Sequence, residues 1–205
     1  SLSFDDRVKP SFEDAKFIAD YLISATGSAT FLKNTVYYYR KREDGSSTLD
    51  KAGQDVRRYG DIYKFGIIEM LRSYHSRFGE VPENIQVTAL YDFIWQLKLL
   101  LNNPERISFL TKDQKDEFYA LCYELFEYID AKQIMRFNLA NTWFMHKVGM
   151  LGQFKSEKPN MQICYIESVD FAKKQICISY FTYFDIVCDI RISNKSIVPS
   201  YHKKI

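Results

Sequence analysis

The feature that most constrains the fold is a long stretch, from about Lys51 to Phe154, in which apolar residues recur at helical spacing. Glycine and proline residues divide this stretch into pieces of helix length. The predicted helices cover residues 56–78, 85–101, 111–130 and 132–148. Thr111 and Gln114 have the spacing of a capping box, so the third helix begins there. Helices with one apolar stripe bury it against one another, and the stretch therefore predicts a small helical bundle.

A different pattern follows the charged, proline-containing linker at residues 155–160. Residues 163–169, 175–183 and 186–192 are rich in β-branched and aromatic side chains, and turn-like residues separate them. They predict three or more antiparallel strands. The chain is thus expected to be a mainly helical α+β protein. Its expected domains are residues 1–50, residues 51–157, and an antiparallel β segment at 158–205 that we expect to be truncated.

Charge and composition exclude several classes of function. The formal net charge is +2, without a dense basic stripe, so nucleic-acid binding is not expected. The histidines lie far apart and the four cysteines form no C-x-x-C pair, so no metal site of the zinc type is expected. The cysteines are interpreted as reduced, half-buried thiols of a cytosolic protein. Neither a signal peptide nor a transmembrane helix is indicated.

The first fifty residues contain the two segments of greatest chemical interest. Pro10 and Ser11 precede a helical pattern over residues 12–23, which Gly27 ends. Residues 30–39, with three successive tyrosines, predict a buried strand. A polar loop follows, and it extends to Asp50 with Gly45 as its turn residue.

Glu13 and Asp14 are adjacent carboxylates at the start of the predicted helix. One interpretation makes one of them a general base, which takes a proton from an acceptor hydroxyl as its oxygen attacks an electrophilic carbon. The other interpretation is structural. Ser11 and Asp14 have the spacing of a helix cap, and acidic residues in a first turn interact favourably with the helix dipole. On spacing alone, the structural interpretation is favoured.

The loop at residues 40–47 has three cations, a turn glycine and two hydroxyls in the sequence RKREDGSS. Arginine side chains and backbone amides in such a loop suit a phosphate or pyrophosphate group. A solvated loop after a strand is the alternative. The loop pattern by itself favours that alternative.

Taken together, the two segments resemble a known family. The sequence PSFEDA at residues 10–15, followed by a strand and by YYYRKREDGSSTL at 37–49, is similar to the end of the catalytic domain of GT-A-fold, family-two glycosyltransferases. The resemblance is most marked for bacterial enzymes of teichoic acid and capsular polymer synthesis, including domains fused to CDP-glycerol glycerophosphotransferases. It implies that Asp14 is the catalytic base of an inverting transfer, with Glu13 as its neighbour. It also implies a set of residues for the donor diphosphate: Arg40, Arg42, Ser46 and Ser47.

The sequence departs from this family before the Glu-Asp pair, where no nucleotide-binding strands and no D-x-D metal motif stand. We therefore expect a fragment that is inactive by itself. The longer protein would use a nucleotide-sugar, a polymer acceptor and a divalent cation, Mg²⁺ or Mn²⁺, with no metal or cofactor held by this chain. A cytoplasmic location is expected, and peripheral association with the inner face of the membrane and oligomerisation stay open.

The main alternative is a non-catalytic module that docks polymer or a partner subunit. The 15 tyrosines and 16 phenylalanines motivate it, because aromatic residues are enriched in interfaces. Asp92 and Trp95 would suit a sugar platform, but the apolar neighbours of Trp95 favour a core position. Trp143 and Phe144, beside His146, are interpreted as helix packing.

Overall fold

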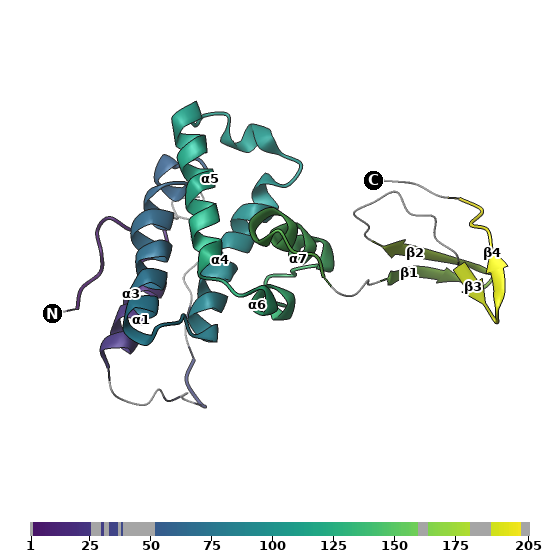
Figure 1. Ribbon diagram of the computed structural model, residues 1–205, viewed down its shortest axis with the longest axis horizontal. Helices are drawn as coiled ribbons and strands as arrows, with labels where there is room; N and C mark the ends of the chain where they lie inside the picture. The colour runs from purple at the N-terminus through teal and green to yellow at the C-terminus, as the bar shows by residue number, and fades with distance from the viewer. Residues whose placement is uncertain are drawn as a thin grey trace. The chain divides into compact units, whose positions relative to one another are not determined.

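The computed structural model describes residues 2–25, 30, 33–36, 38, 52–159, 164–180 and 190–201. The chain divides into two compact units, Ser1–Pro159 and Asn160–Ile205. The first unit is helical and the second contains antiparallel strands (Figure 1). The predicted class, a mainly helical α+β protein, is therefore confirmed.

The first unit is an assembly of packed helices, in which the pieces labelled η are 3₁₀ or π helices. Helix α1 packs on α3 and η2, and η2 in turn packs on α5 (Figure 1). None of its helices, within the described residues, combines the length and the apolarity that a membrane crossing requires. In chain order the elements are α1 Glu13–Ser24, η1 Val56–Arg58, η2 Ile62–Ile68, α3 Glu69–Phe78, α4 Glu83–Leu100, η3 Pro104–Ile107, α5 Lys112–Glu127, α6 Ala131–Arg136, α7 Phe144–Met150 and η4 Leu151–Lys155.

Several helix ends were predicted correctly from local sequence patterns. The predicted helix over residues 56–78 is the run η1, η2 and α3, and it ends at Gly79, whose φ of 77° is left-handed. The capping box of α5 is confirmed as well. The Thr111 N–H donates to Gln114 Oε1 at 2.9 Å, and the Gln114 N–H donates to Thr111 Oγ1 at 3.2 Å.

The single helix predicted over residues 132–148 is wrong, because the chain breaks between α6 and α7. Ala140 has a φ of 53°, a value that a right-handed helix does not accommodate. The side chain of Lys147 satisfies one acceptor in the last turn of α6 and one in the break: its Nζ donates to Met135 O at 2.9 Å and to Asn138 Oδ1 at 2.7 Å. A long-range side-chain contact thus replaces the helical hydrogen bonds that a continuous helix would have had.

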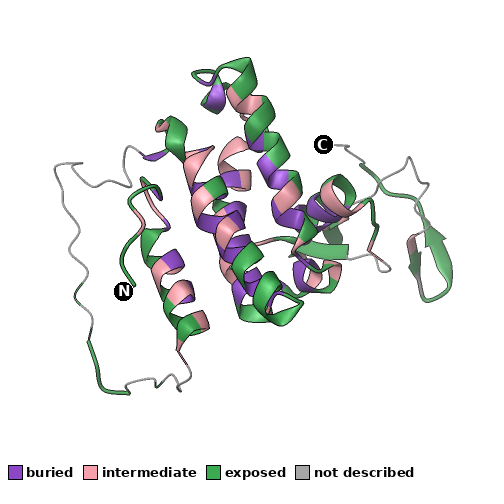
Figure 2. Ribbon diagram, turned by 60° about the vertical axis from the view of Figure 1, so that its left-hand side comes forward, coloured by how far each residue is buried: buried purple, intermediate pink, exposed green. Residues whose placement is uncertain are grey.

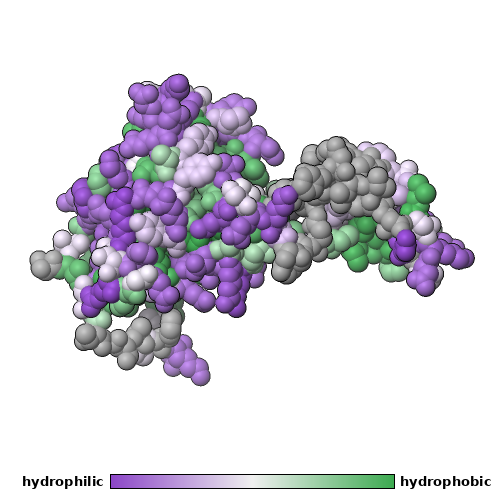
Figure 3. Space-filling model, in the orientation of Figure 1, coloured by the Kyte–Doolittle hydropathy of each residue, from purple (hydrophilic) through white to green (hydrophobic). Residues whose placement is uncertain are grey.

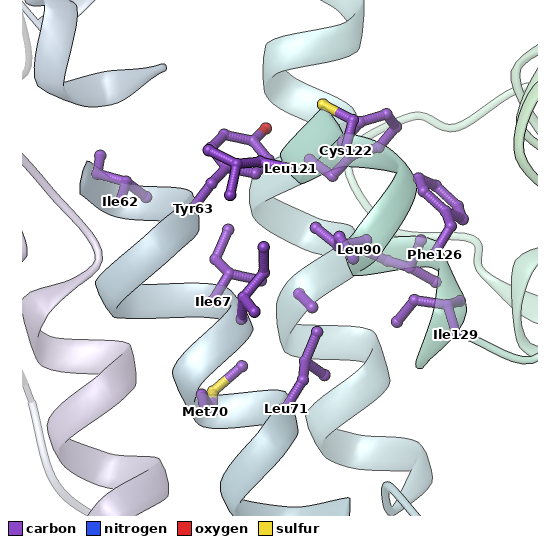
Figure 4. Close-up of a cluster of buried hydrophobic side chains, with 14 of the residues drawn as sticks. Ile62, Tyr63, Ile67, Met70, Leu71, Leu90, Leu121, Cys122, Phe126 and Ile129 are labelled. Atoms are coloured by element: carbon purple, nitrogen blue, oxygen red, sulfur yellow. The ribbon is translucent and has the colours of Figure 1, made fainter. Parts of the chain in front are cut away.

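The core of the first unit lies between η2, α3, α4 and α5. Ile67 and Leu71 face Leu90 of α4 and Phe126 of α5 (Figure 4). The Phe126 ring also stacks on Phe154 with the centroids 4.2 Å apart. The buried positions occur where the helices pack together, and the outer faces are exposed (Figure 2). Burying each such side chain stabilises the fold by about 1.5–3 kcal/mol.

The predicted buried strand at residues 30–39 is described only at residues 30, 33–36 and 38. None of these is in a strand, and residues 33–34 form a turn. Val36 and Tyr38 are 69% and 88% exposed. The prediction therefore fails at the described positions, where a polar, turn-forming Lys-Asn pair interrupts the apolar pattern. Gly27 and the loop at 40–50 lie outside the described residues.

The second unit contains two antiparallel hairpins. Strand β1, Cys164–Asp170, pairs with β2, Gln175–Tyr180, and β3, Ile190–Ile192, pairs with β4, Lys195–Ile197. Two of the predicted strands are thus found as β1 and β2. Among the described side chains of this unit none is buried, and hydrophobic residues reach its surface in Figure 3.

Candidate functional site

Glu13 and Asp14 form the first turn of α1, and both side chains are exposed. The helix begins at Glu13 because Phe12, at its N-terminal boundary, has a left-handed φ of 77°. No side chain caps the helix, so the interpretation of Ser11 as its cap is wrong. The N–H of Ala15 donates to Asp14 Oδ1 at 2.7 Å. The two carboxylates keep the favourable position at a helix N-terminus that the sequence predicted.

The segment before α1 is anchored in the core. Val8 and Phe12 are buried, and both pack over Gly66 in η2. A Cβ on Gly66 would lie 3.0 Å from Phe12 Cδ1 and 3.2 Å from Val8 Cγ1. A residue with a side chain would therefore push this segment outward, and only glycine allows so close an approach. The backbone that presents Glu13 and Asp14 is thus fixed by packing behind it.

Arg7 links this segment to α3 through salt bridges. Its Nη2 lies 2.7 Å from Asp5 Oδ2 and 2.9 Å from Glu69 Oε2, and its guanidinium lies 4.6 Å above the Phe65 ring. The hydrogen bond from Arg7 holds the pKa of Asp5 below its usual value. The Arg7 guanidinium is exposed to solvent, so these pairs contribute little to stability. Their main effect is to orient the segment.

Helix α1 is also held along its length. The Tyr74 hydroxyl of α3 donates to the Ala19 carbonyl at 2.8 Å, and both residues are buried. Lys16 is buried as well and pairs with Asp20 at 2.7 Å. Helix α1 is thus fixed to α3, and the backbone that carries Asp14 has a defined position.

A cluster of polar side chains lies beside this helix start. Arg58 Nε donates to Gln96 Oε1 at 2.7 Å, and Arg58 Nη1 donates to Ser11 Oγ at 3.4 Å. Ser11 is only three residues before Asp14, so the cluster and the carboxylates share one segment. Burial raises the pKa of Asp92, and the nearby charge of Arg58 lowers it in part.

Two atoms of this buried region have no hydrogen-bond partner among the described residues. They are the Tyr63 hydroxyl and Gln96 Nε2. Tyr63 lies in the core beside Leu121 and Cys122 (Figure 4), and burial raises its pKa. An unpaired buried polar atom costs roughly 1–3 kcal/mol. Sequence reasoning missed this cluster because its members are far apart in the chain and match no motif.

The residues predicted for the donor diphosphate lie outside the described residues. These residues are Arg40, Arg42, Ser46 and Ser47. Their position relative to Asp14 stays a prediction. Within the described ranges, no three His, Cys, Asp or Glu side chains are grouped to hold a metal ion. Cys122 is buried, whereas Cys164 and Cys177 are exposed, so the prediction of half-buried thiols is wrong for these three.

The two tryptophans have positions that the sequence did not indicate. Trp95 is 45% exposed and Trp143 is 64% exposed, so the interpretations as core and as helix packing are wrong. Phe144 is buried as expected. Trp95 is exposed because it lies on the outer face of α4 together with Tyr91, whereas Phe93 lies on the face that meets the core.

Comparison with known proteins finds a distant sequence similarity. The chain is 25% identical over 149 residues to the minor teichoic acid biosynthesis protein GgaB of Bacillus subtilis (strain 168). The chain is thus similar to a protein of teichoic acid biosynthesis. The matched region covers 71% of this chain but 16% of that protein, so the chain spans about a sixth of its length. No model of a protein family and no solved structure matches the chain.

Proposed function

We propose that this chain supplies the acceptor side of an inverting sugar-transfer site, with Asp14 as the general base. The observation that carries the proposal is the placement of Asp14: it is exposed, and it begins a helix whose leading segment is locked over Gly66. The similarity to a teichoic acid biosynthesis protein supports a wall or capsule polymer as the acceptor. The GT-A fold and the nucleotide-sugar donor come from the resemblance of the Glu-Asp segment.

In the proposed reaction, Asp14 takes the proton of an acceptor hydroxyl while the hydroxyl oxygen forms a bond to the anomeric carbon of the donor. The bond between that carbon and the diphosphate oxygen breaks, and its electron pair stays with the diphosphate. Attack opposite to the leaving group inverts the anomeric carbon. Arg40 and Arg42 counter the charge on the departing diphosphate, and Ser46 and Ser47 hydrogen-bond to it.

The donor half of the site lies, in this proposal, in a longer protein that includes this chain. In this proposal, the divalent cation implied by the resemblance belongs to that half. We expect the isolated chain to transfer no sugar, because a base without a bound donor has no electrophile to pair with.

The proposal is tested with Asp14→Asn in the longer protein, measured as sugar transfer from a nucleotide-sugar to polymer. Loss of the general base is expected to lower kcat by about 100-fold or more. Glu13→Gln is the matched control, because Glu13 is adjacent and equally exposed, and we expect transfer to fall far less. Circular dichroism of the two variants checks that α1 still forms. Near-normal transfer by Asp14→Asn would contradict the assignment.

A second candidate function is a non-catalytic module that docks polymer or a partner subunit. The exposed rings of Tyr91, Trp95 and Trp143 favour it, because aromatic rings at a surface suit binding rather than folding. In that case the Asp14→Asn protein transfers sugar normally, while the isolated chain still binds polymer. One variant, Asp14→Asn, and two measurements, sugar transfer and polymer binding, therefore distinguish the two functions.

A further inference from the structure

An exposed aromatic surface lies on the outer face of α4 and on the turn before α7. We define it by Tyr91, Trp95, Lys98 and Trp143. The first three follow one another at spacings of four and three residues, which places them on one face of the helix. The Tyr91 and Trp95 rings meet edge to face with centroids 6.3 Å apart. This surface is far along the chain from Asp14 and takes no part in the proposed chemistry.

Lys98 connects the two parts of the aromatic surface, the outer face of α4 and the turn before α7. Its Nζ donates to Ala140 O at 2.8 Å and to Asn141 O at 3.4 Å, and it lies 5.5 Å from the centre of the Trp95 ring. An ammonium group has three donors, so one is left after these two bonds. Among the described residues, Lys98 has no carboxylate within ion-pair distance. The surface thus carries a fixed, uncompensated positive charge beside a flat ring.

Trp143 belongs to the same surface. The Trp143 N–H donates to Nδ1 of His146 at 3.0 Å, and the two rings lie 6.5 Å apart. Burial lowers the pKa of His146, and the positive charge of Lys98 lowers it further. The hydrogen bonds of Lys98 to Ala140 O and Asn141 O place the cation at the turn that precedes Trp143. Both effects on His146 favour its neutral form, so Lys98 is the cation of this surface.

This combination of groups suits a sugar chain. One face of a pyranose ring is made of C–H groups and packs on an aromatic ring, while its rim of hydroxyls needs hydrogen-bond partners. The aromatic surface offers flat rings separated by polar groups, and the free donor of Lys98 and its charge attract an oxygen that carries negative charge. Lysine is depleted in protein–protein interfaces, whereas Lys98 is part of this surface, so a carbohydrate is favoured over a protein partner.

We propose that the aromatic surface binds a carbohydrate chain, with sugar rings on Trp95 and Trp143 and an oxygen of the chain accepting a hydrogen bond from Lys98. That this carbohydrate is the acceptor polymer rests on the proposed function. The binding itself does not, because it requires neither Asp14 nor a donor. The surface would hold a part of the polymer other than the reacting hydroxyl and so keep a growing chain attached between transfers.

The composition of the chain allows a direct test. Trp95 and Trp143 are its two tryptophans, so its tryptophan fluorescence reports on this surface alone. The full chain is titrated with wall teichoic acid purified from Bacillus subtilis, and Trp95→Phe and Trp143→Phe each leave one reporter. We expect the emission of both single-tryptophan proteins to change on binding. Trp95→Ala and Trp143→Ala should each weaken binding roughly tenfold, as measured by isothermal titration calorimetry.

Two further variants sharpen the result. Lys98→Gln keeps a hydrogen-bond donor but removes the charge, and it should weaken binding and reduce its dependence on salt. Tyr119→Ala is the matched control, because Tyr119 is 51% exposed on α5 and lies outside the aromatic surface. We expect it to bind as the unaltered chain does. Polyphosphate, a polyanion without sugar rings, should bind at least tenfold more weakly than the polymer.

Three outcomes would overturn the proposal. The first is unchanged binding by both alanine variants, and the second is equally tight binding of polyphosphate. The third is self-association in light scattering that Trp95→Ala abolishes, because a second copy of the chain would then cover the surface. Asp14→Asn separates this proposal from the proposed function. It should bind polymer normally, and retained transfer by Asp14→Asn would sink the catalytic role while leaving the carbohydrate surface intact.

Discussion

The two units of the chain differ in the interactions that stabilise each of them internally. The helical unit buries whole side chains between α3, α4 and α5, and Phe126 is 0% exposed. In the β unit, by contrast, backbone pairing joins the strands, and no described side chain is buried. Phe171, next to β1, is 87% exposed. Two-stranded hairpins are marginally stable by themselves, so we infer that the helical unit determines the cooperative stability of the chain.

The largest expected effect tests this difference directly. Phe126→Ala removes a ring that stacks on Phe154 and meets Phe93 edge to face, with centroids 4.9 Å apart in the second pair. It should lower the free energy of unfolding by about 3–5 kcal/mol, measured by urea denaturation and circular dichroism. Phe171→Ala is the matched change in the β unit, with an expected effect within about 0.5 kcal/mol. Equal losses would show that the β unit has a core of its own.

A smaller effect is expected within the helical unit, where the segment before Asp14 packs on η2. Gly66→Ala places a methyl group against Val8 and Phe12. Overpacking of this kind should cost about 1–3 kcal/mol and should weaken protection of the α1 amides in hydrogen exchange.

Gly149→Ala is the control for Gly66→Ala, because a Cβ at Gly149 in α7 meets nothing within 4 Å. There the substitution should stabilise the protein by about 0.5–1 kcal/mol through its helix propensity. If Gly66→Ala were to stabilise the protein by a similar amount, the segment at Val8 and Phe12 would not be anchored as described.

The smallest effect concerns a carboxylate of the helical unit whose pKa is shifted by burial. Burial raises the pKa of Asp92 above its value in the unfolded chain, so the ionised form destabilises the native state. The native state gains stability from this group as pH falls through the raised pKa, and the gain is complete below the unfolded pKa of about 3.9. Asp92→Asn should therefore raise the free energy of unfolding near pH 7 and have little effect near pH 3.

In the β unit the corresponding change is Glu167→Gln, at an exposed carboxylate that accepts from the Ser179 hydroxyl. Denaturation at several pH values should give curves that match the unaltered protein within about 0.5 kcal/mol. A loss of stability near pH 7 in Asp92→Asn would mean that the attraction of Arg58 outweighs the cost of burying the carboxylate.

The sequence predicted those parts of the fold that local chemistry determines. The end of α3 at Gly79 and the capping box at Thr111 follow from residues within one turn of each position. The break between α6 and α7 did not follow, because it depends on Lys147 reaching back to Met135 O. Trp95 was misplaced for a related reason: periodicity groups residues by face, but only packing decides which face meets a neighbour.

For the candidate site, the sequence proposed the chemical groups but did not indicate what supports them. The exposure and helical position of Glu13 and Asp14 agree with the pattern, and the placement of the loop at 40–47 stays a prediction. The close approach at Gly66 was not predictable, because 52 positions separate it from Asp14 and a lone glycine carries no information about what packs on it.

The π-helical stretch η2 has a consequence for the direction in which α1 faces. A π turn contains an extra residue compared with an α turn, and one residue corresponds to a rotation of about 100° around the helix axis. With an ordinary α turn at η2, Glu69 and Tyr74 would be rotated away from Arg7 and Ala19. Removing a single residue there would rotate α3 relative to α1 and break the contacts of Arg7 with Glu69 and of Tyr74 with Ala19, so the direction in which α1 presents Asp14 would change.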